Sequence, residues 1–352
     1  MRTPLSFEAL RDQLAALAVP AGQARELVWV VPDRLGAAMT DAGAFEIFLL
    51  GSPLQAASPL VAGNLQHDRW EPIAGGPPFE ASRVLLGSAA HFAAVAALIA
   101  TELSRLDVST ATAMQRSFNE VEPIIELAIR RAALSSEAIL GLIAELHVLR
   151  AALLATAAGD DRAATLLSWR GWAPGRDFVL GGHGIEVKAT LGAASRHRFS
   201  GIHQLEPQLL DNACAERLHL MSFGLEPVAA GGLDLPELVD DLLSLLSDDR
   251  GARTPQQGQL LAMIASYGGA GAPSYEHDAM RGWNVYQQRF AITFARLYDV
   301  ADPEMRLLDR GLVEQTFVVP DSLSFELAVP SLLSAFNPVE DWQKEIAAMA
   351  RE

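Results

Sequence analysis

Lysine and cysteine are almost absent from this sequence. Lys188 and Lys344 are the only lysines, although lysine and arginine together number 27, so nearly every basic side chain is an arginine. Cys214 is the only cysteine, which excludes an intramolecular disulfide and a cluster of thiolate metal ligands. This usage favours a buried free thiol in a protein of a reducing compartment.

Signatures of several other protein classes are also missing. There is no P-loop, no Gly-x-Ser-x-Gly nucleophile elbow and no dinucleotide-binding glycine fingerprint at a strand-to-helix junction. His147 and His183 have no partner at the spacing of a zinc site. Trp169 and Trp172 are interpreted as packing residues and not as platforms for base stacking. If the pathway needs ATP hydrolysis, we expect it from another chain.

The N-terminal segment lacks the pattern of a signal peptide. Residues 1–20 include Glu8, Arg11 and Asp12 within a helical pattern, which interrupts the apolar region that export requires. Val84–Thr101 is the one uncharged run long enough to suggest a membrane span, but it is rich in alanine and contains serine and histidine. We interpret this run as a strand followed by a buried helix, and we predict a cytoplasmic protein with no membrane partner.

Length, composition and charge describe a folded protein of more than one module. The chain has 352 residues, of which 50% are hydrophobic and 20% are charged, and a single core usually stops growing near about 250 residues. The formal net charge is -16. The protein as a whole therefore repels polyanions, and contact with nucleic acid requires a local basic patch or a partner.

Apolar periodicity and turn residues divide the chain into three segments. Residues 1–134 are predicted as an N-terminal α+β module, with a helix near its start, strands at Leu27–Val31 and Phe45–Leu50, and a Pro/Gly break at Glu71–Pro78. Residues 135–210 form the predicted nuclease core. Residues 211–352 form a C-terminal α+β module, which can complete that core.

The predicted core begins with a helix and continues with a hairpin. Ser135 or Ser136 can cap a helix that runs through Ala155, and Trp169–Thr190 has the pattern of strand, turn, strand. In the C-terminal module we predict helices at Leu235–Leu246 and Gly258–Tyr267. The strands predicted there are Leu218–Leu225, Phe290–Tyr298 and Thr316–Val319.

The hairpin carries the polar residues that indicate chemistry. Asp177 begins its first strand, glycines at positions 181–184 form the turn, and Ile185–Thr190 forms the second strand. Alternation along a strand places Glu186 and Lys188 on one face. Pairing across the turn can bring Asp177 alongside them.

Two carboxylates and one ammonium group suit cleavage of a phosphodiester. Carboxylate oxygens are ligands for Mg²⁺, which keeps several waters and accepts phosphate oxygens. A cation held by Asp177 and Glu186 can neutralise charge in the transition state and activate water. Lys188 can orient or help to deprotonate that water and stabilise charge, because an ammonium is a compact donor.

The preceding helix contributes a further acid. Glu145 lies one turn after Gly141, with apolar neighbours that aim its carboxylate partly toward the core. A glycine within a helix costs about 1 kcal/mol relative to alanine, so Gly141 is interpreted as permitting close approach to the sheet. A solvated position at the helix edge is the alternative for Glu145.

These residues resemble the PD-(D/E)XK nuclease superfamily. The resemblance rests on Gly141-x-x-x-Glu145, Trp169-x-Gly171, Asp177 and Ile185-Glu-Val-Lys188, and it covers about residues 135–206. More narrowly, the chain is similar to bacterial PD-(D/E)XK-motif proteins of unknown function that are encoded beside restriction-modification and phage-defence genes. The resemblance implies a restriction-endonuclease-like α/β fold, α+β overall, with a central mixed β-sheet flanked by helices.

The resemblance also implies roles for individual residues. Asp177, Glu186 and the carbonyl of Val187 would be metal ligands, Lys188 the catalytic lysine and Glu145 an auxiliary acid. Mg²⁺ would be the cofactor, for which Mn²⁺ can substitute. Arg176 stands where the name of the motif has proline, a common departure in this degenerate superfamily.

Three further residues are candidates for binding the substrate. Arg196 and Arg198 lie in the most basic short run of the core and could hold phosphates. An exposed polar loop is the alternative interpretation of this run. Gln204 stands where related nucleases often place a polar residue that reaches the site or the substrate.

The sequence thus predicts a magnesium-dependent endodeoxyribonuclease. It is expected to be a subunit of a bacterial restriction or phage-defence system that acts on DNA with protein partners, such as an ATPase or methyltransferase subunit, or as a homodimer. A catalytically inactive nuclease-fold scaffold is the main alternative. A third possibility is that Glu186 and Lys188 are merely an exposed strand pair, worth less than about 1 kcal/mol.

Overall fold

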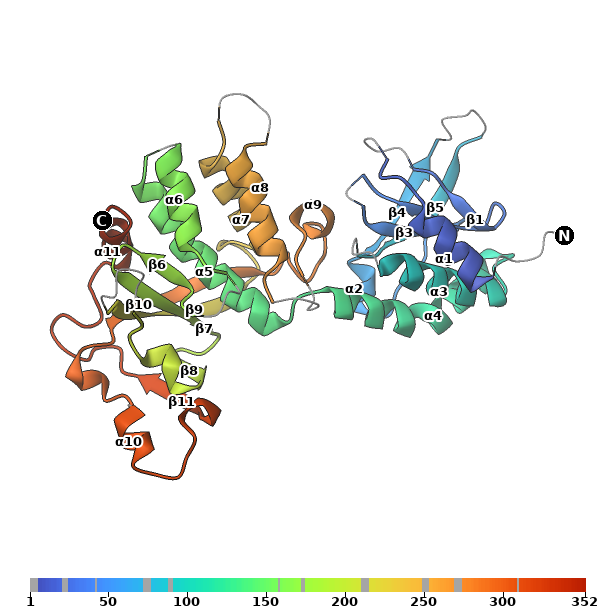
Figure 1. Ribbon diagram of the computed structural model, residues 1–352. Coiled ribbons are helices and arrows are strands. Elements are labelled where there is room, and N and C mark those ends of the chain that lie inside the picture. The colour runs from blue at the N-terminus through green and yellow to red at the C-terminus, as the bar shows by residue number, and fades with distance from the viewer. Residues whose placement is uncertain are drawn as a thin grey trace. The chain divides into compact units, whose positions relative to one another are not determined.

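The structure is a computed structural model that divides into two compact units (Figure 1). Unit 1 comprises Met1–Leu134 and Glu276–Gln287, and unit 2 comprises Ser135–Tyr275 and Gln288–Glu352. The structure describes residues 6–20, 25–41, 43–71, 77–87, 91–157, 159–171, 175–209, 215–248, 253–268, 274–308 and 310–352. Trp172 and Cys214, discussed above, lie outside these ranges.

Unit 1 contains a five-stranded antiparallel sheet in the order β1–β2–β3–β5–β4. Its strands are β1 (Val28–Val31), β2 (Leu35–Met39), β3 (Phe45–Leu50), β4 (Leu65–Trp70) and β5 (Phe79–Leu85). β2 and β4 are absent from the sequence-based prediction, because β2 has small residues and β4 is largely polar. Pairing with neighbouring strands outweighs these weak local preferences.

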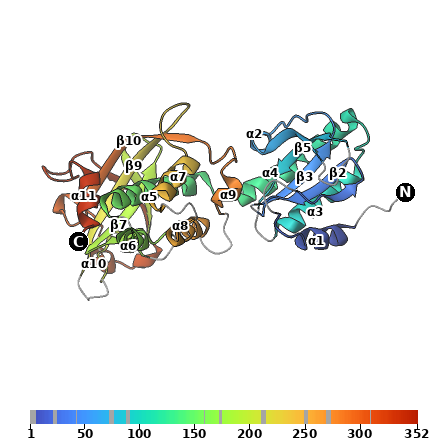
Figure 2. The same cartoon turned by 90° about the horizontal axis from the view of Figure 1, so that it is seen from above.

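Helices cover one face of this sheet. α3 (Phe92–Arg105) contacts β1, β2 and β3, and α1 (Phe7–Ala15) packs on α3 and β1 (Figure 2). The described part of the uncharged run Val84–Thr101 therefore lies at the end of β5 and in the buried helix α3, as predicted. Further helices of unit 1 are α2 (Pro59–Ala62), α4 (Ala111–Ala132) and α9 (His277–Met280).

Unit 2 is built around a four-stranded sheet of mixed orientation in the order β10–β9–β7–β6. β7 (His183–Thr190) is antiparallel to β6 (Phe178–Leu180) and parallel to β9 (Arg217–Val228), which is antiparallel to β10 (Arg289–Asp299). β9 and β10 follow residue 210, so the sheet that carries the Glu-x-Lys strand draws on residues from both sides of that predicted boundary. The mixed sheet and its helices confirm the predicted α+β class.

A central helix packs against this sheet. α5 (Ser136–Ala155) contacts β7, α7 (Leu235–Leu245) and α11 (Trp342–Met349), and the Ser135 hydroxyl accepts a hydrogen bond of 3.1 Å from the N–H of Ala138 at its start. α6 (Asp160–Ser168) and α8 (Pro255–Ala265) lie on the same side of the sheet as α7 (Figure 1).

One helical stretch of the described residues is long and apolar enough to cross a membrane. This stretch, Ala111–Ala155, includes α4 and α5. Its most apolar window is 61% buried inside the structure. A mostly buried core helix of a globular domain passes the same test of length and composition.

A smaller two-stranded sheet pairs β8 (Ser195–Ser200) with β11 (Ser324–Val329). Phe199, Leu218, Tyr298 and Val329 belong to the apolar cluster that joins it to β9 and β10. The strand predicted at Thr316–Val319 is wrong, because these residues form a turn whose apolar side chains are exposed. The short elements of this region are η1 (Ile202–Leu205), η2 (Pro303–Met305), α10 (Arg310–Glu314) and η3 (Pro320–Ser322).

Candidate metal centre

Strand β7 presents the acidic and basic residues of the Glu-x-Lys motif together. The Glu186 side chain is 3% exposed and that of Lys188 is 21% exposed, and Lys188 Nζ donates to Glu186 Oε1 at 2.6 Å. This pair is mostly buried, so it is not the exposed strand pair of the third interpretation. A buried ion pair requires well-placed partners to offset the loss of hydration.

Asp177 reaches the same place from the residue before β6. Its Oδ2 accepts a hydrogen bond of 2.6 Å from the backbone N–H of Val187, which lies between Glu186 and Lys188. The hairpin turn is tighter than predicted: Leu180 pairs with His183, so residues 181 and 182 form the turn and His183 belongs to β7. The structure therefore brings Asp177, Glu186 and Lys188 together.

The two oxygens of Glu186 have different surroundings. Oε1 accepts hydrogen bonds from Lys188 Nζ and, at 3.0 Å, from Gln204 Nε2. Oε2 is buried and accepts no hydrogen bond from the described residues, although Arg176 Nη1 lies 4.0 Å away. An unpaired buried carboxylate oxygen is costly, so this atom is the clearest candidate for a bond to a cation.

Burial and the neighbouring negative charges shift the pKa of Asp177. Burial raises the pKa of this carboxyl well above its usual range, and the neighbouring carboxylates of Glu145 and Glu186 raise it further. Lys188 and the Val187 N–H act in the opposite direction without cancelling the effect. A divalent cation would supply the missing positive charge.

The donor set fits a hard cation. Among the described residues, Glu186 Oε2 is buried without a protein donor, and Asp177 accepts the Val187 N–H through Oδ2. No group of three or more His, Cys, Asp and Glu side chains in the described ranges could hold a metal. The candidate centre thus comprises the carboxylates of Asp177 and Glu186, with the Val187 carbonyl as a further expected ligand. Mg²⁺ usually completes a coordination shell of this kind with water molecules.

Lys188 remains protonated in this environment. Burial by itself would lower the pKa of its ammonium group, but the carboxylates of Glu186 and Asp177 outweigh that effect and the pKa lies above its ordinary value. Nζ also lies 5.3 Å from the ring centroid of Phe199, over its face. These surroundings therefore favour a role for Lys188 as a charged hydrogen-bond donor over a role as a free base.

Glu145 is buried and not solvated at a helix edge. It is 5% exposed, its Oε2 accepts from Trp169 Nε1 at 2.7 Å, and its Oε1 accepts from the Tyr267 hydroxyl at 2.6 Å. Burial raises the pKa of Glu145 to about 7, although the hydrogen bonds from Trp169 and Tyr267 lower it. Trp169 thus packs in the core, as predicted, and also orients this acid.

Gly141 makes room for a side chain and not for the sheet. A Cβ atom at this position would lie 2.9 Å from the Tyr267 hydroxyl oxygen. That hydroxyl donates to Glu145, one helical turn along α5. The glycine therefore allows Tyr267 to reach Glu145, which corrects the predicted reason for its presence.

Gly141→Ala is expected to destabilise the protein by at least about 1 kcal/mol. The gain in helix propensity, about 1 kcal/mol, is smaller than the cost of leaving a buried carboxyl and a buried hydroxyl poorly bonded, about 1–3 kcal/mol for each group. Gly258→Ala in α8 is the matched control, because a Cβ there meets nothing within 4 Å. Urea denaturation that shows both substitutions to be stabilising would contradict this assignment.

Glu145 is also expected to make stability depend on pH. Because its pKa rises from 4.5 to about 7 on folding, the unfolded chain ionises first, and stability present below pH 4.5 is lost as the pH rises toward 7. Wild type should lose up to about 3 kcal/mol over this interval relative to Glu145→Gln. The exposed Glu137→Gln in the same helix should show no such difference in denaturation at pH 5 and pH 8, and equal pH profiles for wild type and Glu145→Gln would refute the assignment.

The two predicted phosphate-binding arginines are not brought to the carboxylates. Arg196 and Arg198 point to the exposed face of β8, where Arg196 Nε lies 3.2 Å from Glu326 Oε1 and Arg198 Nε donates to Ser324 Oγ at 3.0 Å. The alternate residues of β8 face inward. Contact between these arginines and DNA remains a prediction.

Gln204 lies beside Glu186. Its Nε2 donates to Glu186 Oε1 at 3.0 Å, and its Oε1 accepts at 2.9 Å from the N–H of Ser200. Both ends of the amide are therefore held. Gln204 contacts a candidate metal ligand in this structure, and a contact with substrate stays a prediction.

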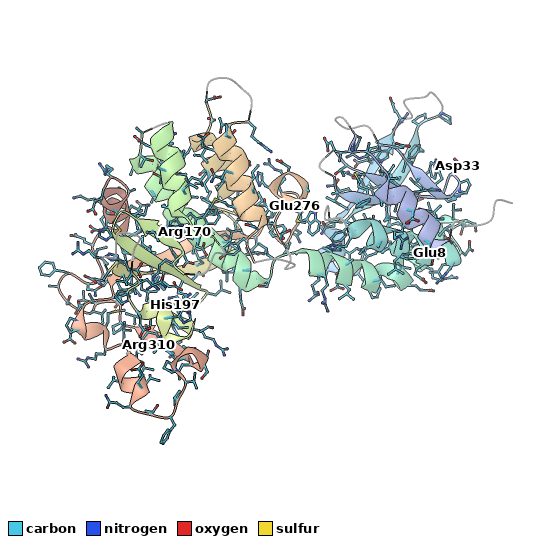
Figure 3. The ribbon with its side chains drawn as sticks, viewed as in Figure 1. Glu8, Asp33, Arg170, His197, Glu276 and Arg310 are labelled. Atoms are coloured by element: carbon cyan, nitrogen blue, oxygen red, sulfur yellow. The ribbon has the colours of Figure 1, made fainter. Side chains whose placement is uncertain are left out.

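Several residues near the site are not evident from the sequence. His197 of β8, labelled in Figure 3, is buried, and its Nε2 lies 2.7 Å from the Ser222 hydroxyl of β9. Burial and the nearby Lys188 lower the pKa of His197 to about 4, so the ring is neutral. Tyr267 comes from a segment far along the chain, and no spacing pattern links it to Glu145.

His183 also has a neighbour that sequence spacing does not indicate. The parallel pairing of β7 with β9 places His183 Nδ1 2.9 Å from His219 Nε2. His183 Nε2 lies 3.2 Å from Glu352 Oε2. The ring of His183 is therefore engaged on both sides by protein groups, and no zinc site is assigned to it.

Comparison with known proteins identifies a family but no individual relative. Residues 88–291 match the model of the family described as "Putative PD-(D/E)XK family member, (DUF4420)". The match spans more than half of the chain and includes Glu145, Asp177, Glu186 and Lys188. No curated protein and no solved structure matches the chain.

Proposed function

We propose that this chain, which belongs to the PD-(D/E)XK family matched by residues 88–291, is a metal-dependent endodeoxyribonuclease that hydrolyses phosphodiester bonds. The observation that carries the proposal is the buried Glu186 oxygen without a donor, next to Asp177 and the protonated Lys188. Nuclease-like members of this superfamily generally use divalent metals. Mg²⁺, or Mn²⁺ in its place, is the proposed cofactor.

Each residue has a separate task in the proposed reaction. Asp177, Glu186 and the Val187 carbonyl would hold the cation, which supplies charge neutralisation at the scissile phosphate and activation of water. Lys188 would donate a hydrogen bond to the phosphate or the attacking water and stabilise the negative charge that develops. Gln204 orients Glu186, and Glu145 adds an acid whose proton is exchangeable near neutral pH.

The substrate and its delivery are part of the proposal. DNA would approach the carboxylates, and Arg196 and Arg198 would hold its backbone farther from the reacting phosphate. Because the net charge is -16, a protein partner or a second copy would help to bring the protein to DNA. We place it in the bacterial cytoplasm as a subunit of a restriction or phage-defence system.

Cleavage assays test this function directly. Supercoiled and linear DNA would be incubated with Mg²⁺ or Mn²⁺ and with wild type or Asp177→Asn, alone and with the products of neighbouring genes. Asp177→Asn is expected to lower the cleavage rate by about 10²-fold or more, because it weakens the cation site. The matched control is Glu226→Gln, an exposed carboxylate of β9, which should cut at the wild-type rate.

The other outcomes separate the alternatives. Cutting that persists in Asp177→Asn would mean a contaminant or a different active site. A wild-type protein that neither cuts DNA nor binds Mn²⁺ would contradict the nuclease assignment. Such a result would favour an inactive scaffold of the same fold.

A further inference from the structure

Arg176 is a buried cation beside the candidate metal centre. It immediately precedes Asp177, and its side chain is 1% exposed. Arginine cannot shed its charge in proteins, so burying it requires that its donors be satisfied. Its contacts therefore indicate what the residue holds in place.

The guanidinium group binds a carboxylate and a run of backbone carbonyls. Nε donates to Glu216 Oε1 at 2.6 Å, and Nη1 donates to the carbonyls of Gln204 at 2.7 Å and His203 at 3.3 Å. Nη2 donates to the carbonyl of Glu206. These carbonyls lie in and just after η1, and backbone carbonyls at the end of a helix attract a cation.

The segment that Arg176 holds is the one that presents Gln204 to Glu186. Gln204 Nε2 donates to Glu186 Oε1, while its backbone carbonyl accepts from Arg176. Arg176 Nη1 itself stays 4.0 Å from Glu186 Oε2, beyond hydrogen-bond distance. Oε1 is thus occupied by protein donors and Oε2 is left for a ligand.

We propose that Arg176 is a positioning residue of the metal centre, which acts through Gln204 to orient Glu186. As the chain neighbour of Asp177, it links the residues that enter β6, which carry one carboxylate, to the segment that orients the other. Residues that orient metal ligands typically contribute about 10- to 100-fold to metal affinity. The inference rests on the proposed function, because it assumes a cation between Asp177 and Glu186.

A double-mutant cycle on Mn²⁺ binding tests the proposal without relying on catalysis. The dissociation constant of Mn²⁺ would be measured by calorimetry for wild type, Arg176→Lys, Gln204→Ala and the double variant. Each single substitution is expected to weaken binding about 10- to 100-fold. The double variant should bind Mn²⁺ with the affinity of the weaker-binding single variant, to within about threefold. Both substitutions break the same chain of contacts from Arg176 through Gln204 to Glu186.

The matched control is Arg289→Lys. Arg289 also donates to one glutamate, Glu237, and to two backbone carbonyls, those of Gly231 and Gly232, and none of these partners belongs to the candidate metal centre. Its substitution should leave the Mn²⁺ affinity unchanged. If Arg176→Lys does not fold, as judged by thermal melting, Glu216→Gln takes its place in the cycle. The amide removes the charge that anchors Arg176 Nε and keeps an oxygen that can accept from the Gln208 N–H.

The outcomes distinguish this inference from the function on which it rests. Multiplicative losses in the double variant, or an Arg176→Lys protein that binds Mn²⁺ as wild type does, would overturn the positioning role while leaving the metal centre intact. A wild-type protein without an Mn²⁺ site that depends on Asp177 would instead overturn the proposed function, and the inference with it.

Discussion

Lys188→Met is expected to lower the rate of metal-dependent DNA cleavage by about 10²- to 10⁴-fold. The substitution keeps an unbranched side chain over Phe199 but removes the ammonium that lies 2.6 Å from Glu186 Oε1. The lost group is a charged donor, because the carboxylates of Glu186 and Asp177 hold the pKa of Lys188 above its ordinary value against the opposing effect of burial. Mn²⁺ should still bind, because removing a positive charge beside the carboxylates favours the cation and offsets the loss of the Lys188 hydrogen bond to Glu186 Oε1.

Two further variants sharpen this test. Lys344→Met, which replaces the only other lysine and lies exposed on α11, should cut at the wild-type rate. Lys188→Arg should remain strongly impaired, because a planar guanidinium does not reproduce a compact ammonium in a partly buried site. Wild-type cleavage by Lys188→Met would remove Lys188 from the proposed mechanism.

Arg176→Met is expected to reduce the free energy of unfolding by about 3–5 kcal/mol. Removing one partner of a buried ion pair leaves the other charge uncompensated, and here Glu216 would remain 4% exposed without its Nε partner. The carbonyls of residues 203, 204 and 206 would also lose their donors. Urea denaturation followed by circular dichroism measures the change.

Arg289→Met is the control for this effect. Arg289 makes the same kinds of contact, but its side chain is 30% exposed, so water can replace much of what is lost and a decrease of about 1–2 kcal/mol is expected. An equal decrease in the free energy of unfolding for Arg176→Met and Arg289→Met would show that burial does not determine how much Arg176 stabilises the protein. A decrease below about 1 kcal/mol for Arg176→Met would mean that water or a rearranged protein group hydrogen-bonds to the Glu216 carboxylate in place of Arg176.

Local sequence patterns were sufficient to predict the helix and the hairpin that carry the carboxylates. Alternation along residues 185–190 indicates a strand with Glu186 and Lys188 on one face, and the glycines before it indicate a turn that returns to Asp177. The apolar stripe after Ser135 indicates α5 and the direction of Glu145. These inferences need only the periodicity of a helix or strand and the reach of a short turn.

The other contacts of the candidate site could not be predicted from the sequence, because they join residues that are far apart in the chain and have no regular spacing. The parallel pairing of β7 with β9 sets His183 beside His219 and Ser222 near Lys188. Tyr267 meets Glu145 from the turn after α8, more than a hundred residues later in the chain. Burial gave Arg176 its partners and raised the pKa of Asp177 and Glu145. The sequence by itself determines which residue types are present and which of them share a face of a strand or helix. The packing of distant segments decides which side chains are buried away from water and which charged groups lie close together.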